Sequence, residues 1–301
     1  MTGTPSRVAL ITGGNSGIGF ATARKLAARG FHVIMASRNQ QTSAQAIARL
    51  KADQPNASVE SIPLDLASFA SVRQCAATFQ TKDYALHVLI NNAGGSIKGK
   101  QASFTVDGFE MTFGMNHLGH FLLTNLLLDN LKQSAPARVI TVSSQRHIPG
   151  YGGGPGAKFD YDNLKAEKFY DSAAFYNNSK LANIWFTYEL QRRLTGSGVT
   201  SNAVCPGFVP EAIGDRRTSA FDRLLYRKIL PRMPFARTLD QASSSYLMAA
   251  TDPRWEGIGG KFIVDGNERR SSDESYDEAK ARKLWDVSWT WCGLEGNAIT
   301  A

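Results

Sequence analysis

The 301-residue chain lacks the usual marks of secreted, membrane-spanning and metal-binding proteins. Its three cysteines, Cys75, Cys205 and Cys292, lie too far apart for a disulfide framework or a zinc pattern, as expected in a reducing compartment. No apolar run is long enough to span a membrane, and the first nine residues are too short and polar for a signal peptide. These absences predict a globular protein of the cytoplasm, with a length that allows one or two domains.

The chain is basic. Its net charge is +8 at pH 7, while its hydrophobic content of 43% and charged content of 20% are ordinary for a globular protein. A positive balance attracts anionic ligands, nucleic acid among them. The basic residues are spread along the chain and no nucleic-acid-binding motif occurs, so the sequence predicts no nucleic-acid partner.

The N-terminal segment has the pattern strand, glycine-rich turn, helix, strand. Residues 7–12 form a short apolar run, a helical pattern over 20–29 follows, and residues 31–37 form a second strand. Glycines occupy positions 13, 17 and 19 of the intervening turn. Glycines let a backbone approach a pyrophosphate, and a helix N-terminus supplies N–H groups with a partial positive charge. A plain tight turn is the alternative, but this position between strand and helix predicts dinucleotide binding.

The residue after the second predicted strand bears on the choice of cofactor. An acidic residue there would bind the ribose hydroxyls of NAD, but this chain has Ser37 followed by Arg38. A guanidinium can pair with a 2′-phosphate through a planar set of donors. The sequence therefore predicts NADP(H) rather than NAD(H), the alternative being that Arg38 is only a surface residue.

Strands and helices continue to alternate to the C-terminus. Further strands are predicted over 59–64, 85–90, 138–142, 200–204 and 259–264, and further helices over 41–51, 71–81, 109–131 and 277–291. No internal repeat or linker interrupts the pattern. It predicts an α/β fold: a single doubly wound, Rossmann-type parallel sheet with helices on both faces, in one domain spanning residues 1–301.

Tyr176 and Lys180 lie four residues apart in a helical pattern. Positions i and i+4 share one face of a helix, so the phenol and the ammonium can point at the same small volume. A nearby positive charge favours the phenolate, which lets a tyrosine exchange a proton with an alcohol or a carbonyl oxygen near neutral pH. Such a pair on a helix surface usually has no function, so the hypothesis that Tyr176 is an acid/base depends on the rest of the chain.

Two further motifs occur in order along the chain: Thr12-Gly13-x-x-x-Gly17-x-Gly19, and Asn91-Asn92-Ala93-Gly94 after the fourth predicted strand. With Tyr176 and Lys180, they resemble the short-chain dehydrogenase/reductase family, and the resemblance covers nearly the whole chain. Residues 179–183 (SKLAN) and 189–194 (ELQRRL) are similar to the retinol dehydrogenase side of a branch that also includes light-dependent protochlorophyllide reductase.

The resemblance implies roles for four catalytic residues. Tyr176 would be the acid/base, Lys180 would assist it and bind the nicotinamide ribose, and Ser144, favoured over Ser143, would orient the substrate oxygen. Asn116 would hold a proton-relay water, the alternative being that its amide satisfies a backbone group. The implied cofactor-binding residues follow the predicted strands: Gly13, Asn15, Ser16, Gly17, Ile18, Gly19, Arg38, Asp65, Leu66, Asn92, Ala93, Gly94, Tyr176, Lys180, Pro206, Gly207 and Val209.

Two features depart from a simple match. His117 and His120 lie three apart in the predicted helix, but no third ligand has a suitable spacing, so no metal site is predicted. The family usually has a threonine four residues after the glycine of its Pro-Gly pair, where it contacts the nicotinamide amide, and this chain has Glu211 there.

The C-terminal part is expected to form the substrate side. The glycine-rich loop over 148–157 either borders the substrate pocket or is a surface connection. The resemblance implies a substrate lid around 210–240, where basic and apolar residues alternate, and a solvated amphipathic helix or a membrane-surface contact are the alternatives. The lid's basic residues are Arg216, Arg217, Arg223, Arg227, Lys228, Arg232 and Arg237. Three tryptophans over 285–291 would pack on the core or meet a second subunit of a homo-oligomer.

Taken together, the sequence predicts NADP(H)-dependent reduction of a carbonyl, or the reverse oxidation of an alcohol. The lid's apolar residues favour a bulky hydrophobic substrate, such as a retinoid-like, steroid-like or polyketide-like carbonyl. Three alternatives remain: a light-dependent C=C reductase of a bound pigment, a non-catalytic NADP-binding regulator, and a membrane-surface protein. The intact serine, tyrosine and lysine set argues against the regulator.

Overall fold

The computed structural model describes residues 7–97, 99–214 and 224–295. Residues 1–6 and the lid residues Arg216, Arg217 and Arg223 lie outside this range. The side chain of Arg227 is likewise outside it. The described lid residues are therefore 210–214 and 224–240.

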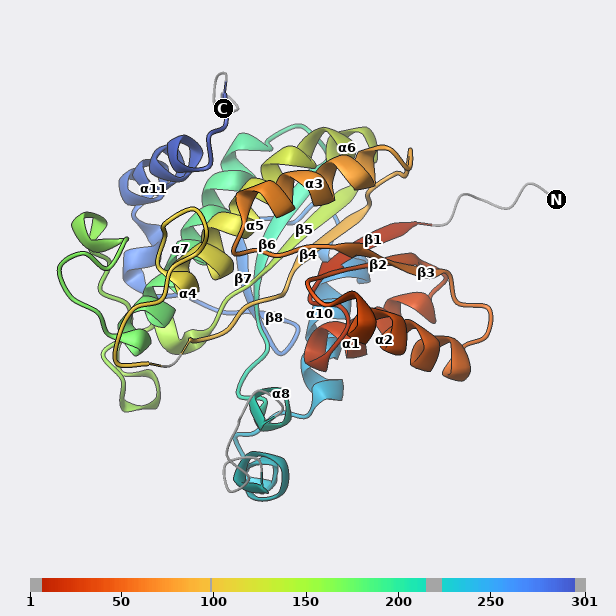
Figure 1. Ribbon diagram of the computed structural model, residues 1–301, viewed down its shortest axis with the longest axis horizontal. Coiled ribbons are helices and arrows are strands. Elements are labelled where there is room, and N and C mark those ends of the chain that lie inside the picture. Colours follow the sequence, from red (N-terminus) through yellow and green to blue (C-terminus); the bar gives the residue numbers. More distant parts are fainter. Residues whose placement is uncertain (1–6, 98, 215–223, 296–301) are drawn as a thin grey trace.

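A single central sheet carries the described part of the chain (Figure 1). Its eight strands follow the order β3-β2-β1-β4-β5-β6-β7-β8. Their bounds are β1 Val8–Thr12, β2 His32–Ser37, β3 Val59–Pro63, β4 Val88–Asn91, β5 Ala137–Val142, β6 Val199–Cys205, β7 Lys261–Val264 and β8 Asn267–Glu268. Neighbours from β3 to β7 pair in parallel, and the short edge strand β8 runs antiparallel to β7. The predicted doubly wound sheet is confirmed, with one antiparallel strand added.

Helices cover both faces of this sheet (Figure 1). One face is covered by α1 (Gly17–Ala27), α2 (Gln40–Asp53) and α10 (Leu239–Thr251), and the other by α3 (Phe69–Gln80), α5 (Gly119–Leu126), α6 (Leu128–Gln133), α7 (Ser172–Arg193) and α11 (Glu278–Trp291). Strand β1 shows why both faces need a cover. Val8 and Leu10 enter one hydrophobic core and Ala9 and Ile11 the other, so a continuous apolar run is buried on both sides.

The long helix predicted over 109–131 is divided. It consists of α4 (Met111–Phe113), a π-helical segment η1 (Gly114–Leu118), α5 and α6. After η1 the chain passes very close to the end of β3, because a Cβ at Gly119 would lie 2.7 Å from the Leu66 carbonyl oxygen. π-Helical turns inside α-helices are often found at functional sites. This one contains Asn116.

Helix α10 was missed by the sequence analysis, although its start carries a recognisable signal. The Thr238 side chain accepts from the Gln241 backbone N–H, and the Gln241 side chain accepts from the Thr238 N–H, which is a capping box. Lys25 of α1 bonds the Asp240 carbonyl at 2.8 Å and the Ser244 hydroxyl at 2.7 Å. These contacts fix α10 beside the helix that follows the glycine turn.

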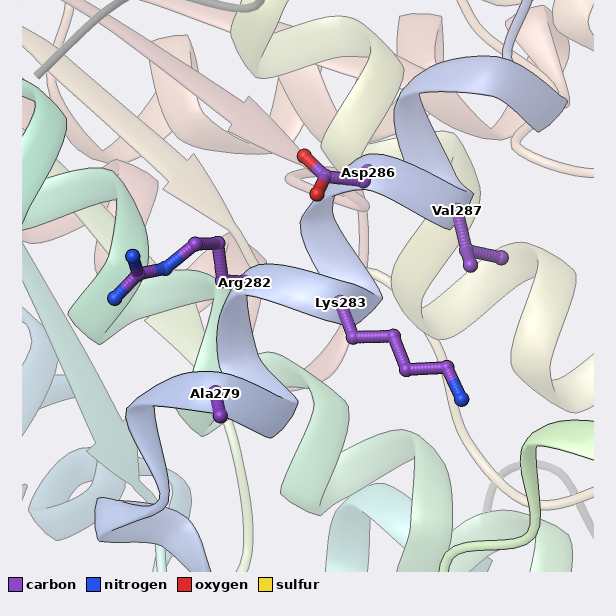
Figure 2. Close-up of a pocket in the computed structure, with 5 residues that line it drawn as sticks. All are labelled: Ala279, Arg282, Lys283, Asp286 and Val287. Atoms are coloured by element: carbon purple, nitrogen blue, oxygen red, sulfur yellow. The ribbon is translucent and has the colours of Figure 1, made fainter.

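Helix α11 packs along α7 through aromatic side chains. Trp285 is buried and stacks on Phe186 with ring centroids 5.9 Å apart, while Trp289 and Trp291 are partly buried against the same core. Of the two alternatives for these tryptophans, packing on the core is therefore observed. The outer face of α11 carries a shallow hollow lined by Ala279, Arg282, Lys283, Asp286 and Val287 (Figure 2). None of the predicted site residues lines it.

Among residues 7–97, 99–214 and 224–295, no helix combines the length and the apolar character that crossing a bilayer requires.

Candidate active site

The predicted cofactor residues gather at the carboxyl edge of the sheet. The turn 13–19 follows β1, Arg38 follows β2, Asp65 and Leu66 follow β3, residues 92–94 follow β4, and residues 206–209 follow β6. Strands β1 and β4 are neighbours, and the strand order reverses between them. In open parallel sheets, ligands bind in the crevice outside such a switch point.

The turn after β1 leaves little space between its peptides. Gly13 has a φ of +66°, and a Cβ at Gly19 would lie 2.3 Å from the Gly13 carbonyl oxygen, so no side chain fits there. Helix α1 starts at Gly17, and the side chain of its N-cap residue, Ser16, makes no capping bond. Asn15 donates to the Thr42 hydroxyl at 2.9 Å and so ties the turn to α2. A backbone concavity at a helix N-terminus is the arrangement that holds a pyrophosphate.

Hydrogen bonds of Thr12 and Asn92 join this turn to the end of β4. The N–H groups of Asn92 and Ala93 each donate to Thr12 Oγ1 at 2.9 Å, and Asn92 Nδ2 donates to the Thr12 carbonyl at 2.8 Å. Gly94 has a φ of +138°, and a Cβ there would lie 2.2 Å from Asn116 Oδ1. The second motif is thus packed between the glycine turn and the π-helical segment.

Tyr176 and Lys180 lie together on α7. Lys180 Nζ is 5.6 Å from the centroid of the Tyr176 ring and donates to the Val142 carbonyl at the end of β5, 3.1 Å away. Lys180 is only 5% exposed, whereas Tyr176 is half-buried. Asn183 Nδ2 donates to the same carbonyl at 3.0 Å. The ammonium is therefore held at the carboxyl edge, one strand from the residues 92–94.

Asn116 supports this pair from η1. Its Nδ2 donates to Ser179 Oγ at 3.0 Å, and Ser179 Oγ donates to the Tyr176 carbonyl at 2.7 Å. The same amide makes a reciprocal pair with the backbone of Gly95, through its Nδ2 at 3.0 Å and its Oδ1 at 2.9 Å. Asn116 thus satisfies a backbone group, as the alternative expected, and also braces the stretch of α7 that carries Tyr176 and Lys180.

The two strand-end serines have different surroundings. Ser143 is 1% exposed and donates its hydroxyl to the Lys180 carbonyl at 2.7 Å. Ser144 is half-buried, and its hydroxyl accepts only a long bond of 3.3 Å from the Arg146 N–H among the described hydrogen bonds. Ser144 is therefore the more available of the two.

His147 was not singled out from the sequence. Its Nε2 accepts from the Ser272 N–H at 3.2 Å, so its Nδ1 carries the hydrogen that is donated to the Ser144 carbonyl. Burial lowers the pKa of His147, which keeps the ring neutral. The sequence offered one signal, a histidine three residues after a strand-end serine. The residue that donates to its Nε2, Ser272, lies 125 positions further along the chain, so no local pattern indicates that bond.

The predicted residues at the ends of β2 and β3 have unequal exposure. Arg38 is exposed beside Asn39, the N-cap of α2. Asp65 Oδ1 accepts from the Ala67 N–H at 3.0 Å and closes its own turn. Leu66 is buried in the core.

The segment after β6 turns back toward the glycine turn. Pro206 and Gly207 are half-buried, and Val209 is buried. Helix α8 (Pro210–Gly214) contains Glu211, and the Cβ of its neighbour Ala212 lies 3.8 Å from the position that a Cβ would take at Gly17. Helix α8, which carries Glu211, therefore lies beside the predicted phosphate site.

Two further segments border the edge: the glycine-rich loop, and the described lid residues, of which 225–229 pack against α8. Asn177 Nδ2 donates to the Gly156 carbonyl at 3.0 Å, which ties the loop to α7 next to Tyr176. The lid carries exposed apolar side chains at Leu224, Ile229, Met233 and Phe235. Within the lid, Arg237 makes a two-pronged ion pair with Asp265, with N–O distances of 3.1 and 2.7 Å.

Known proteins match this chain over most of its length. A family model described as short chain dehydrogenase matches residues 7–155. Retinol dehydrogenase 12 of Mus musculus is 41% identical over 291 residues, which cover 97% of this chain and 88% of the relative. The chain belongs to the short-chain dehydrogenase/reductase family. Polyprenol dehydrogenase of Homo sapiens is 40% identical over 296 residues, covering 96% of this chain and 86% of the relative. Within the family, these relatives place the chain in a retinol dehydrogenase-like branch.

Solved structures of the same fold agree. A crystal structure of an uncharacterized protein from Mycobacterium Paratuberculosis has a TM-score of 0.72 and 34% identity, with 98% of each chain covered. An active-site complex of RhlG with NADP from Pseudomonas aeruginosa has a TM-score of 0.65 and 26% identity, covering 86% of this chain and 94% of that one. The chain is thus a short-chain dehydrogenase/reductase oxidoreductase that uses a nicotinamide dinucleotide.

Proposed function

We propose that this short-chain dehydrogenase/reductase is an NADP(H)-dependent enzyme that interconverts a carbonyl and an alcohol on a bulky hydrophobic substrate. The observation that carries the proposal is the position of Lys180. Its ammonium lies 5.6 Å from the Tyr176 ring and is held on the Val142 carbonyl, at the sheet edge where the cofactor motifs also end.

The sheet edge fits a dinucleotide. The bound dinucleotide supplies the hydride chemistry. The turn 13–19 would hold its pyrophosphate, because the turn combines closely packed glycines with the N-terminus of α1. Arg38 would pair with a 2′-phosphate, since it is exposed and has no hydrogen bond or ion pair with another described residue. The NADP complex of RhlG supports this choice.

Four side chains would manage the proton and the substrate oxygen. The Tyr176 hydroxyl gives a proton to the carbonyl oxygen, or takes it from the alcohol in the reverse direction. The Lys180 ammonium stabilises negative charge on the phenol oxygen. Ser144 donates a hydrogen bond to the substrate oxygen and orients it. Asn116 holds Tyr176 in place through Ser179, and its segment would also hold the relay water.

The described lid residues support a hydrophobic substrate. Four apolar side chains of the lid are between 41% and 59% exposed, namely Leu224, Ile229, Met233 and Phe235. At the base of the lid, the rings of Phe208 and Phe235 pack with their centroids 5.9 Å apart. Retinol and polyprenol, which name two of the relatives, are themselves hydrophobic alcohols. Retinoid and isoprenoid carbonyls are therefore the first substrates to test.

The same segment favours a peripheral contact with an anionic membrane as a second property. Its exposed apolar side chains lie beside the exposed cations Lys228 and Arg232. Apolar side chains that enter the lipid boundary and cations that meet its headgroups are what an interfacial helix uses. We expect the protein to sediment with phosphatidylserine vesicles and not with phosphatidylcholine vesicles. Equal recovery with both would contradict the electrostatic contribution.

The test of the main proposal is a carbonyl panel followed at the NADPH absorbance band. Retinoid, steroid and long isoprenoid carbonyls are offered with NADPH and, in parallel, with NADH. We expect turnover of apolar carbonyls, with kcat/KM for NADPH at least about tenfold above that for NADH, since one charged pairing is worth about 1.4 kcal/mol or more. A preference for NADH would overturn the role of Arg38. Conversion only of a bound pigment and only in light would instead support the C=C reductase.

A further inference from the structure

His120 is a fully buried titratable residue to which the proposed reaction assigns no role. It is 1% exposed and lies in the first turn of α5, four residues after Asn116. Both ring nitrogens are engaged. Nε2 lies 2.9 Å from Thr12 Oγ1, and Nδ1 lies 3.1 Å from the Asn116 carbonyl oxygen.

The hydrogen positions follow from the partners. The Asn116 carbonyl can only accept, so Nδ1 must carry a hydrogen. Thr12 Oγ1 already accepts from the N–H groups of Asn92 and Ala93, so its own hydrogen is left to donate. It points to Nε2 at 2.9 Å rather than to the Ile90 carbonyl, which is 3.4 Å away. The ring is thus neutral, with Nδ1 as donor and Nε2 as acceptor.

The surroundings keep this ring neutral. Burial, with a smaller contribution from the charge of Lys180, lowers the pKa of His120 to about 4. A neutral ring can accept from Thr12 while it donates to Asn116, whereas an imidazolium could not accept. One tautomer therefore links two parts of the active site.

The two parts are those that the proposed function assigns to different tasks. On one side, Thr12 holds the backbone of Asn92 and Ala93 at the cofactor edge. On the other, Asn116 holds Ser179, which bonds the Tyr176 carbonyl on the catalytic helix. His120 is the side chain that bonds both Thr12 and Asn116.

We propose that His120 is a positioning residue that couples the dinucleotide-binding turn to the catalytic helix, through one nitrogen to Thr12 and the other to Asn116. Loss of the Thr12 bond loosens the cofactor edge and weakens dinucleotide binding. Loss of the Asn116 bond lets the π-helical segment shift and slows turnover. The turnover half of this inference rests on the proposed function, whereas the binding half does not.

The two bonds can be removed one at a time. An asparagine at position 120 places its amide nitrogen near the position of Nδ1 and keeps the donor to Asn116, but it does not reach Thr12. A glutamine reaches the position of Nε2 with an oxygen that accepts from Thr12, but it leaves the Asn116 carbonyl without this donor. His120→Phe removes both bonds and keeps an aromatic ring.

The experiment measures two quantities for each variant: the NADPH Kd by calorimetry, and kcat at saturating NADPH. For His120→Asn we expect a Kd about five- to tenfold weaker with kcat within about threefold of the wild type, since one hydrogen bond is worth about 1 kcal/mol. For His120→Gln we expect a lower kcat with a Kd close to that of the wild type. For His120→Phe we expect both a weaker Kd and a lower kcat. Thr12→Val should weaken NADPH binding more than His120→Phe does, because it also removes the acceptor of the Asn92 and Ala93 N–H groups, and adding His120→Phe to Thr12→Val should not raise Kd further.

Ser288→Ala is the matched control. Ser288 lies on α11 and bonds His117, a buried histidine of the π-helical segment η1, at 3.0 Å. This variant should lower stability while leaving Kd and kcat within about twofold, because the lost bond runs from η1 to α11 and involves neither Thr12 nor Asn116.

Several outcomes would overturn the inference. They are an unchanged Kd and kcat in His120→Phe, or the same balance of losses in His120→Asn and His120→Gln, or losses in Ser288→Ala as large as those in the His120 variants. If His120→Phe does not fold, the asparagine and glutamine variants decide the matter. If Tyr176→Phe retains full turnover, the proposed function fails, while the Kd values still test the link between His120 and the cofactor edge.

Discussion

The two sides of the carboxyl edge are built differently. On the cofactor side, β1 and β4 end in peptides that touch one another, and the positions of Gly19 and Gly94 leave no space for a Cβ. On the substrate side, the residues after β6 lead to exposed apolar side chains such as Ile229 and Phe235. The shape of the cofactor side is fixed by close backbone contacts. On the substrate side, the kinds of side chain at the surface determine which ligand can bind.

This difference separates the binding of the dinucleotide, which many substrates can share, from the choice of a particular substrate. A dinucleotide needs a backbone concavity, which only glycines allow, so the same residues suit many substrates. A hydrophobic substrate needs apolar area, which many side chains can supply. Changes on the cofactor side should therefore abolish function, whereas changes on the substrate side should alter selectivity.

Gly19→Ala should weaken NADPH binding more than any of the other variants. A small effect would contradict the view that the cofactor side has a sterically fixed shape. The added Cβ would lie 2.3 Å from the Gly13 carbonyl and 2.6 Å from Asn92 Nδ2, so the turn must open. We expect NADPH binding to weaken by at least about 100-fold, because several backbone bonds to the pyrophosphate are lost together. Gly30→Ala is the control: its φ is +78°, and nothing lies within 4 Å of its Cβ position. It should cost about 1 kcal/mol of stability without changing NADPH binding.

Arg38→Asp should change which cofactor is preferred. The guanidinium that pairs with a 2′-phosphate is lost, and a carboxylate that suits the ribose hydroxyls replaces it. We expect the NADPH/NADH ratio of kcat/KM to fall by about 10- to 100-fold, in line with one charged pairing and the repulsion that replaces it. Lys51→Asp, in the last turn of α2, changes the net charge by the same amount and serves as the control for charge alone. A ratio that falls equally in both variants would show that Arg38 acts only through net charge.

Acid should destabilise the fold through the buried histidines. The folded-state pKa is lowered to about 4 for His120 and to about 3 for His117, mainly by burial. Both lie below the unfolded value near 6.5, so the contribution is fully present above pH 6.5 and is lost as pH falls toward about 4. Each histidine contributes a slope of about 1.4 kcal/mol per pH unit over this range.

Urea unfolding of wild type and His120→Gln at pH 7, 6 and 5 checks this. The difference in slope between the two proteins isolates one histidine from all other titrating groups. Parallel pH dependences would show that the pKa of His120 is the same in the folded and the unfolded protein.

Glu211→Thr should change NADPH binding the least of these variants. It tests whether a residue after β6 also influences the cofactor side. The change removes a negative charge from α8, whose Ala212 lies beside the glycine turn. We expect NADPH to bind about threefold more tightly at low salt, with the gain reduced at high salt. Glu211→Gln separates the charge from the hydroxyl, and it should reproduce the gain. If only the threonine improves binding, a direct hydroxyl contact explains it instead.

Features set by local geometry can be predicted from the sequence, whereas bonds between distant residues cannot. The glycine turn and the Tyr176–Lys180 pair depend on local geometry, namely a strand-to-helix turn and one helical repeat. The bond between Thr12 and His120 joins residues 108 positions apart, so no local pattern shows it. The spacing of His117 and His120 invited a comparison with metal ligands, whereas the two rings bond Ser288 on one side and Thr12 and Asn116 on the other.

Other features were missed because a signal was overlooked or absent. The capping box of Thr238 and Gln241 predicts the start of α10 and was not used. The π-helical segment has no comparable sequence signal, because its sequence GMNHL fits an ordinary helix. The serines at 143 and 144 are neighbours in sequence; the resemblance favours Ser144, and the burial of Ser143 makes Ser144 the more available of the two.

Tyr176→Phe tests the central claim most directly, because it removes one hydroxyl and leaves the ring beside Lys180. With the best substrate of the carbonyl panel, we measure kcat at saturating NADPH together with the NADPH Kd. The account predicts a kcat at least about 100-fold lower, the usual contribution of a general acid/base, and a Kd within about threefold of the wild type. Undiminished turnover in this variant would contradict the claim that the Tyr176 phenol transfers the proton.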